Sequence, residues 1–235
     1  MRFKGFVDTS FVDWDGKIVS TLFVPTCNFR CPFCFNHRLI LHPEKYPDIA
    51  ESTITDFLKR NADFLDGVCV TGGEPTTAKG LKEFCQEIIS LGLKVKLDTN
   101  GTNPGLLEEL VSGGLVNYVA MDVKAPPERR KYGIATGTRS SKVLESVKES
   151  ISFLLNSGIE YEFRTTVVPS IHSERDIEEI AKWIGGARLY VLQKFQPENA
   201  WSKRLRKFPS QSDSEMEQLA NIARKHLNLV KWRGR

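Results

Sequence analysis

The alternation of short apolar segments with amphipathic helical segments is the feature that most constrains the fold of this 235-residue chain. Segments rich in β-branched and apolar residues are predicted as strands: Ile18–Val24, Val68–Thr71, Lys94–Asp98, Tyr118–Val123, Glu160–Val168 and Arg188–Lys194. Segments with a helical period are predicted as helices: Thr53–Phe64, Lys79–Leu91, Leu106–Ser112, Lys142–Asn156, Glu174–Trp183 and Ser214–His226. Such alternation predicts a parallel sheet with helices packed outside it.

Six strand–helix units are too few for a closed eight-unit barrel, which usually takes about 250 residues. We therefore expect an α/β fold of the partial (β/α)6 barrel type, with an open doubly wound sheet as the alternative. Residues 1–200 are expected to form the core domain, and residues 201–235 a basic helical extension packed on it. Polar segments such as TGGEPT (71–76), DTNG (98–101) and MDVK (121–124) follow the strands. The active site is expected at this carboxyl edge of the sheet.

The composition excludes several classes of protein. Hydrophobic residues make up 40% of the chain and charged residues 26%, which is ordinary globular usage and excludes a disordered or fibrous protein. No apolar run approaches the ~18 residues that a membrane span needs. The N-terminal sequence MRFKGFVDTS also lacks the apolar core of a signal peptide. We therefore expect a cytoplasmic protein with no membrane partner.

Three of the five cysteines, Cys27, Cys31 and Cys34, are crowded into one short segment. Close-spaced thiols in a chain without an export signal indicate metal ligands rather than disulfides. Four thiolates fill the iron sites of a 4Fe–4S cluster, so three leave one iron open to a non-protein ligand. Cys69 and Cys85 lie inside apolar patterns and are predicted as core residues.

Structural zinc is the alternative for this segment, because His37 follows Cys34 by three residues and completes a three-Cys, one-His set. The corresponding function is a zinc-stabilised nucleic-acid binding module. The C-x3-C-x2-C spacing is less usual for zinc, and a structural zinc does not explain the polar strand ends. His37 is itself predicted as a loop or surface histidine.

CNFRCPFC resembles the C-x3-C-x2-C signature of the radical S-adenosylmethionine (SAM) enzymes, and TGGEP resembles their GGE segment. GFVDTSFVDWDGKIVSTLFVPTCNFRCPFCFN resembles the start of the activating proteins of anaerobic ribonucleotide reductase. LDTNG, AMDVK and RTTVVP resemble segments of the pyruvate formate-lyase activating enzymes. The resemblance covers about residues 5–199. It implies a partial barrel of the radical SAM type, with one oxygen-sensitive 4Fe–4S cluster on Cys27, Cys31 and Cys34 and SAM on the open iron.

The resemblance also implies SAM-binding residues, and assigns no catalytic side chain beyond the cluster and SAM. The residues are Phe33, Gly72, Gly73, Glu74, Asp98, Thr99, Asp122, Lys124, Arg164 and Gln196. The two glycines are expected to let backbone approach the methionine, so a valine at Gly73 should block SAM while leaving iron content near normal. Glu74 is expected to hold the ammonium group. Phe33 is expected near the adenine, and Gln196 stands where some activating enzymes carry an adenine-contacting histidine.

The remaining residues are expected around the SAM carboxylate, where a monovalent cation can bridge. Asp98, Thr99 and Asp122 resemble residues at that position, and Lys124 resembles a lysine near the same end. Arg164 suits a carboxylate or ribose oxygens. Structural alternatives stay open. Gly-Gly-Glu-Pro is also good turn sequence, Asp98 also suits a capped turn, and Lys124 and Arg164 also suit ion pairs with Asp122 or Glu162.

Two enzymatic functions follow from the resemblance. The favoured one is an anaerobic glycyl-radical activating enzyme, which takes a hydrogen atom from a glycine of a partner glycyl radical enzyme and receives electrons from a flavodoxin or ferredoxin-type donor. The alternative is a radical SAM enzyme that modifies a small molecule or an RNA. Residues 201–235 hold nine Lys or Arg residues against three acidic ones, which suits docking of an acidic partner surface. A solvated helix face is the simpler interpretation, and a nucleic-acid partner stays open but is not favoured.

Overall fold

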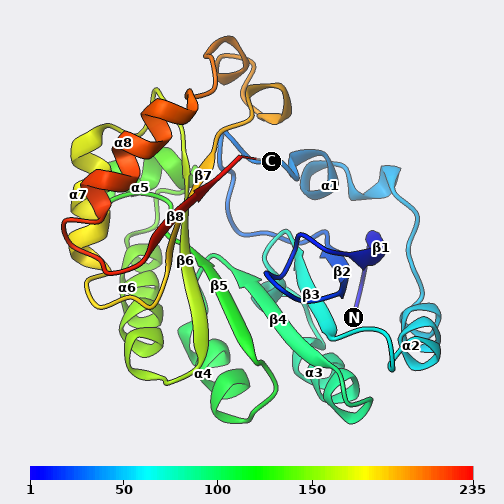
Figure 1. Ribbon diagram of the computed structural model, residues 1–235. Coiled ribbons are helices and arrows are strands. Elements are labelled where there is room, and N and C mark those ends of the chain that lie inside the picture. The colour runs from blue at the N-terminus through cyan, green and yellow to red at the C-terminus, as the bar shows by residue number, and fades with distance from the viewer. Residues whose placement is uncertain (235) are drawn as a thin grey trace. The chain divides into compact units, whose positions relative to one another are not determined.

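The structure is a computed structural model that describes residues 1–234. Arg235, the last residue of the basic C-terminal segment, lies outside the described residues. The strands of the described chain are β1 (Gly5–Ser10), β2 (Val19–Val24), β3 (Gly67–Gly72), β4 (Lys94–Thr99), β5 (Tyr118–Asp122), β6 (Glu160–Val167), β7 (Tyr190–Lys194) and β8 (Val230–Arg233). They belong to one mostly parallel sheet in the order in which they occur in the chain (Figure 1).

Helices follow most of the strands. They are α1 (His37–Leu41), α2 (Glu51–Arg60), α3 (Leu81–Ser90), α4 (Pro104–Ser112), α5 (Arg129–Thr136), α6 (Ser141–Asn156), α7 (Glu174–Trp183) and α8 (Asp213–Ala223). Short 3-10 turns lie at Pro43–Lys45, Pro75–Thr77, Pro197–Asn199 and Leu205–Lys207. Within residues 1–234, no helix is both long and apolar enough to cross a membrane.

The chain divides into two compact units. The first unit consists of Met1–Asn28, Arg38–Thr99 and Gly105–Ala120. The second consists of Phe29–His37, Asn100–Pro104 and the chain from Met121 onwards. The first unit therefore contains Cys27, and the second contains Cys31 and Cys34.

In the first unit, β2 pairs in parallel with β3 and β3 with β4, while β1 pairs antiparallel with β2. Val24 and Gly72 are register partners, so the carboxyl ends of β2 and β3 lie side by side. Consecutive apolar residues of the central strands are fully buried, Val68 and Val70 among them. Burial on both faces is what a parallel sheet covered by helices requires.

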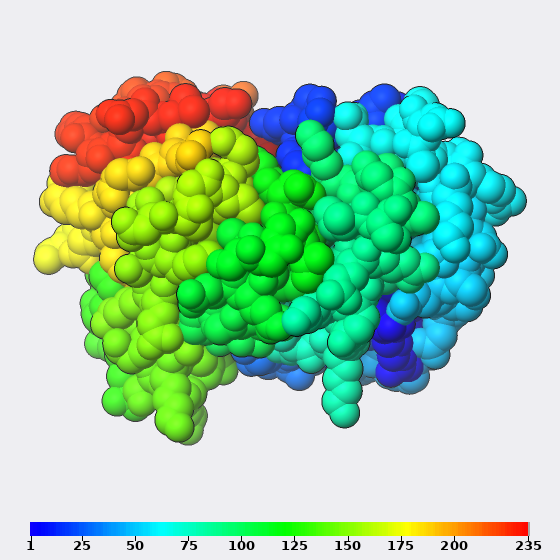
Figure 2. All heavy atoms as spheres, turned by 90° about the horizontal axis from the view of Figure 1, so that it is seen from below, coloured from blue at the N-terminus to red at the C-terminus, as the bar shows by residue number. Residues whose placement is uncertain are grey.

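In the second unit, β6, β7 and β8 pair in parallel. Ser173 caps α7 and Ser212 caps α8, each in a capping box with an acidic residue three positions on. Helix α8 lies along α7, as both views show (Figures 1 and 2). Gln218 of α8 donates to Glu174 of α7 at 2.6 Å. The C-terminal segment is thus a folded part of the second unit.

The expected fold class is confirmed, and each of the six predicted strands is present to within two residues at each end. Four elements were not predicted. Strand β1 is half exposed and shows little apolar alternation, and β8 has four residues and is defined by its pairing with β7. Helix α1 has five residues and α5 contains Gly133, so neither gives a strong helical pattern. The boundary expected at residue 200 stays a prediction, although the segment after it adds β8 as well as a helix.

Candidate active site

The residues assigned to the cluster and to SAM are divided between the two units. The first unit holds Cys27, Gly72, Gly73, Glu74, Asp98 and Thr99. The second holds Cys31, Phe33, Cys34, Asp122, Lys124, Arg164 and Gln196.

The turn after β3 is hydrogen-bonded to the residues that precede Cys27. The Gly73 amide donates to the Val24 carbonyl at 2.8 Å, and the Glu74 amide donates to the Thr26 carbonyl at 2.6 Å. The TGGEP turn therefore holds the start of the cysteine loop in place.

This close approach explains both glycines. A Cβ atom on Gly73 would lie 1.9 Å from the Thr26 carbonyl oxygen. Gly72 has a φ of +104°, and its Cβ would lie 2.6 Å from the Val24 amide nitrogen. No side chain fits at either distance without moving the backbone. Glycine is required at both positions because the turn packs against the backbone that leads into Cys27. The motif alone did not reveal this requirement.

Glu74 lies in a buried network with Thr99, so the structure brings these two predicted residues together. The Glu74 side chain is 1% exposed. Its Oε1 accepts hydrogen bonds from the Thr76 amide at 3.0 Å, the Thr76 hydroxyl at 2.6 Å and the Thr99 hydroxyl at 2.8 Å. Three donors from Thr76 and Thr99 thus hold the Glu74 carboxylate in place.

Asp98 forms an ion pair with Lys96, which sequence reasoning missed. Lys96 Nζ lies 2.9 Å from Asp98 Oδ1 and also donates to the Asp13 carbonyl at 2.6 Å. The Thr71 hydroxyl donates to the other Asp98 oxygen at 3.1 Å. Lys96 is 3% exposed between the buried residues Val95 and Leu97. A lysine inside an apolar strand is a signal for a buried ion pair, and that signal was available.

In the second unit, the cysteine loop is held from two sides. The Arg30 amide donates to the Thr136 carbonyl at the end of α5, at 2.8 Å. The Ser202 amide of the C-terminal segment donates to the Pro32 carbonyl, also at 2.8 Å. Gly137, with a φ of +69°, packs so closely that a Cβ would lie 2.4 Å from the Arg30 carbonyl oxygen. The loop position thus depends on segments more than a hundred residues away in the chain.

The two thiols of this loop lie near positive charge. Cys31 is buried and Cys34 half-buried. Burial raises the pKa of the Cys34 thiol, while the positive charges of Lys124 and Arg30 act in the opposite direction. Burial disfavours the charged form of Lys124, yet the neighbouring Asp122 carboxylate and Cys31 raise its pKa above the ordinary value. Lys124 is therefore a permanent cation beside the thiols.

Asp122, Lys124 and Arg164 form one ion-pair group, so the structure brings these three predicted residues together. Lys124 Nζ lies 2.8 Å from Asp122 Oδ2, and Arg164 Nε lies 2.9 Å from Asp122 Oδ1. Arg164 also lies 3.9 Å from Glu162. The ion pairs that the sequence offered as structural alternatives are thus present.

His172 supports this group and was not predicted. Its Nδ1 accepts from the Val168 amide at 3.0 Å, so Nε2 carries the proton and donates to the Lys124 carbonyl at 2.9 Å. Burial lowers the pKa of His172, which keeps the ring neutral. The ring also contacts Phe33 edge-on, and Lys124 Nζ lies 6.0 Å from the Phe33 ring centre. His172 therefore fixes the backbone of Lys124 and one side of Phe33.

The other predicted residues lie as follows. Gln196 starts the Pro197–Asn199 turn and accepts a hydrogen bond from Asn199 at 2.9 Å. His37 begins α1, and its Nδ1 lies 2.9 Å from the Cys34 carbonyl oxygen. Cys69 and Cys85 are 1% and 0% exposed, which confirms them as core residues. Burial raises the pKa of Cys85 to about 12, so this thiol is inert.

The chemistry of these residues fits an iron–sulfur cluster and a charged ligand. Cys27, Cys31 and Cys34 form no disulfide, and cysteine thiolates are the ligands of such clusters. Nearby cations favour the thiolate form, and Lys124 and Arg30 supply them in the second unit. Arg164 and Lys124 also offer donors suited to a carboxylate.

Comparison with known proteins gives a consistent picture. A family model described as the radical SAM superfamily matches residues 21–184. A Methanocaldococcus jannaschii protein named "Putative glycyl-radical enzyme activating enzyme" is 33% identical over 229 residues, covering 97% of this chain and 93% of that protein. A GTP 3′,8-cyclase of Alkaliphilus oremlandii is 35% identical over 130 residues, covering 53% of this chain and 40% of the cyclase.

Solved structures share the fold. Streptococcus suis SuiB, crystallised with the precursor peptide SuiA, has a TM-score of 0.69 and 15% identity over 92% of this chain and 48% of SuiB. The chain thus spans about half the length of SuiB, and at this identity the likeness concerns the fold alone.

Proposed function

The chain belongs to the radical SAM superfamily, and from this premise we propose that it activates a glycyl radical enzyme. One observation carries the proposal: the 33% identity to the protein named as an activating enzyme extends over 97% of this chain and 93% of that relative. A match over nearly the full length of both chains also includes residues outside the part that the radical SAM family model matches.

Family membership implies a 4Fe–4S cluster and SAM, and argues against the zinc-stabilised nucleic-acid module. We propose that Cys27, Cys31 and Cys34 hold the cluster. When bound, the cluster and SAM supply a 5′-deoxyadenosyl radical, which takes a hydrogen atom from the substrate. The chain's own contribution is to keep the thiols in one loop, fixed by the Gly73 turn in the first unit and by Thr136 and Ser202 in the second.

The residues proposed to bind SAM keep the roles expected from the sequence. In the first unit they are Gly72, Gly73, Glu74, Asp98 and Thr99, and in the second Phe33, Asp122, Lys124, Arg164 and Gln196. Lys124 and Arg164 would orient a carboxylate, since both are cations held by one aspartate. Phe33 would offer an aromatic face to the adenine. A monovalent cation near the SAM carboxylate, a flavodoxin or ferredoxin-type electron donor and a cytoplasmic, anaerobic setting remain parts of the same proposal.

A small-molecule substrate is the second candidate. It is favoured by the 35% identity to the GTP 3′,8-cyclase of Alkaliphilus oremlandii, which covers 53% of this chain. That match extends over 40% of the cyclase, so more than half of the cyclase has no counterpart in it. We therefore rank a nucleotide substrate below a glycyl radical enzyme. An RNA substrate rests on the basic C-terminal segment, where Arg224 and Arg233 already pair with Glu217 and Glu162.

The test is anaerobic reconstitution with iron and sulfide, followed by measurement of 5′-deoxyadenosine after addition of SAM and a reductant. Electron paramagnetic resonance should then detect a glycyl radical when the glycyl radical enzyme encoded nearest to this protein is added. The matched controls are Cys31→Ser, which should lose iron and both products, and Cys85→Ala, which should keep them. Deoxyadenosine formation stimulated by GTP, with no radical on any glycyl radical enzyme, would refute the activase and favour the second candidate.

A further inference from the structure

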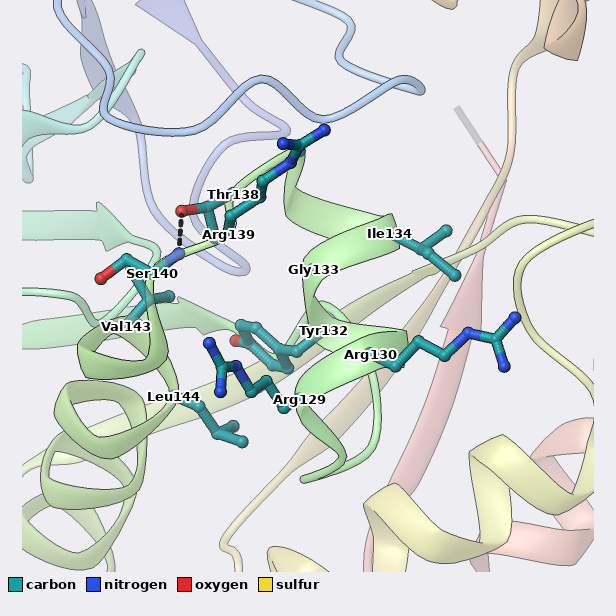
Figure 3. A pocket seen from close by; sticks show the side chains of 11 residues that line it. Arg129, Arg130, Tyr132, Gly133, Ile134, Thr138, Arg139, Ser140, Val143 and Leu144 are labelled. Carbon is teal, nitrogen blue, oxygen red and sulfur yellow. Dashed lines mark hydrogen bonds between the residues drawn. The ribbon is translucent and has the colours of Figure 1, made fainter.

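A groove of about 640 Å³ lies in the second unit between α5 and the start of α6 (Figure 3). None of the residues assigned to the cluster or to SAM lines it. Tyr132 and Leu144 form a buried apolar floor. Ile134 stands at the edge with 52% of its surface exposed. Concave sites with an apolar lining and a few polar side chains are where proteins usually bind ligands.

Arg129, Arg130 and Arg139 line the same groove, and all three are exposed. Across residues 1–234, none of the three forms an ion pair with an acidic side chain. Their neighbour Lys131, by contrast, lies 2.7 Å from Asp176 and 3.4 Å from Glu179. The groove therefore carries positive charge that this chain does not neutralise, which favours an acidic ligand.

The guanidinium groups of the three arginines point in different directions around the groove (Figure 3). A phosphate site would instead bring its donors together on one point. Charges spread along an apolar groove match a peptide with several carboxylates and an apolar side chain between them. We propose that this groove docks an acidic segment of a protein partner, with one apolar side chain of that segment against Ile134.

The groove adjoins the residues that hold the cysteine loop in place. Gly137 lines the groove and packs against the backbone of Arg30. Thr136, one residue earlier, accepts the hydrogen bond of the Arg30 amide at 2.8 Å. A segment bound in the groove therefore contacts the element that positions Cys31 and Cys34. Docking at this place rests on the proposed function, because it assumes that the substrate is a protein.

The first experiment measures binding directly, with full-length protein. The probe is a fluorescein-labelled peptide with the sequence Asp-Glu-Asp-Leu-Phe-Glu-Asp-Glu, followed by fluorescence anisotropy. The triple variant Arg129→Glu, Arg130→Glu, Arg139→Glu should bind at least about tenfold more weakly, since several exposed ion pairs are lost together. The matched triple variant Lys203→Glu, Arg204→Glu, Lys207→Glu makes the same change in charge at residues that do not line the groove. It tests the basic C-terminal segment that the sequence offered for docking, and it should bind within about twofold of the parent.

Two further measurements distinguish docking in the groove from non-specific electrostatic attraction. Ile134→Ser keeps the charge and should weaken binding several-fold, and a peptide with serines in place of Leu-Phe should bind the parent more weakly. Circular dichroism should show that each variant keeps the parent's fold, since all these side chains are exposed. The proposal is overturned if the parent shows no binding up to millimolar peptide, if both triple variants weaken binding equally, or if the serine peptide binds as well. Tighter binding of a short single-stranded RNA that the arginine triple variant abolishes would also overturn it.

The 5′-deoxyadenosine formed from SAM in the absence of a partner enzyme distinguishes failure of this inference from failure of the proposed function. The arginine triple variant should cleave SAM within about twofold of the parent while needing a higher concentration of glycyl radical enzyme for the same radical yield. Absence of deoxyadenosine from the parent would refute the proposed function and leave the peptide measurement to decide docking. An unchanged radical yield from the triple variant at low partner concentration would refute docking alone.

Discussion

Replacing Gly73 with alanine should lower the stability of the protein and its iron content together. The added Cβ would lie 1.9 Å from the Thr26 carbonyl oxygen, which is a backbone atom and does not rotate away. The turn and the residues before Cys27 must therefore separate. The hydrogen bonds from Gly73 to Val24 at 2.8 Å and from Glu74 to Thr26 at 2.6 Å hold this contact together. This expectation replaces the one from sequence alone, in which a side chain at Gly73 blocked SAM but left iron near normal.

The size of the effect follows from the contacts that are lost. Two backbone hydrogen bonds contribute about 1 kcal/mol each to stability. Forcing the backbone to make room for a methyl group costs about 1–3 kcal/mol more. The free energy of unfolding should therefore fall by about 3–5 kcal/mol, a large part of the roughly 5–15 kcal/mol that holds a typical domain folded.

Urea unfolding of the iron-free protein, followed by circular dichroism, measures the stability, and iron and sulfide are assayed after reconstitution. Gly105→Ala is the matched control, because nothing lies within 4 Å of a Cβ at Gly105. This alanine lies in α4 and should leave the stability unchanged or raise it by up to about 1 kcal/mol. A Gly73→Ala protein with the parent's urea midpoint and full iron content would refute the argument.

Three further outcomes test other parts of the structure. Cys31→Ser should lose the visible absorption of the reconstituted cluster, while Cys85→Ala should keep it because Cys85 lies in the core. Thr99→Val removes one of the hydrogen bonds to the buried Glu74 carboxylate and should cost about 1–3 kcal/mol in urea unfolding; Thr99→Ser should restore most of it. Burial lowers the pKa of His172 below its unfolded value of about 6.5. The stability from neutral His172 is therefore complete above that pH and falls at lower pH, by up to ~1.4 kcal/mol per unit. His172→Gln should flatten urea stability between about pH 7 and 5, and an unchanged slope would contradict this account.

Local pattern predicted the parts of the fold that have strong local signals. Glu174–Trp183 was predicted with its observed bounds, because Ser173 caps the helix and apolar residues recur on one face. Strand β8 was not predictable in this way. Val230 becomes part of a strand by pairing with Tyr190 of β7, forty residues earlier in the chain. The identity of such a short strand is set by its partner rather than by its own residues.

The same distinction applies to the site. Cys31 and Glu74 were found because their motifs are contiguous in sequence. Thr136 holds the cysteine loop through its carbonyl group, which any residue possesses, so no residue type marks it in the sequence. His172 differs, since its ring is specific and buried. Its partners, however, are the backbone groups of Val168 and Lys124. The sequence does not show that these two residues, which follow β6 and β5, lie close enough to share one histidine.

Asp98 and Asp122 look alike in sequence, because each has a lysine two residues away. Side chains two residues apart on a strand lie on the same face, and both lysines do pair with their aspartates. Lys96 is 3% exposed and also donates to the Asp13 carbonyl, so its charge is used inside the first unit.

The group around Asp122 differs in that it contains two cations. Lys124 and Arg164 both contact this one carboxylate, each through a different oxygen. Glu162 lies 3.9 Å from Arg164 and 3.1 Å from Arg233. Cationic side chains form strong charge-assisted hydrogen bonds with carboxylates. Of the two aspartates that the motif treats alike, Asp98 pairs with a lysine that is buried in the first unit, and we propose that Asp122 positions two cations for the carboxylate of SAM.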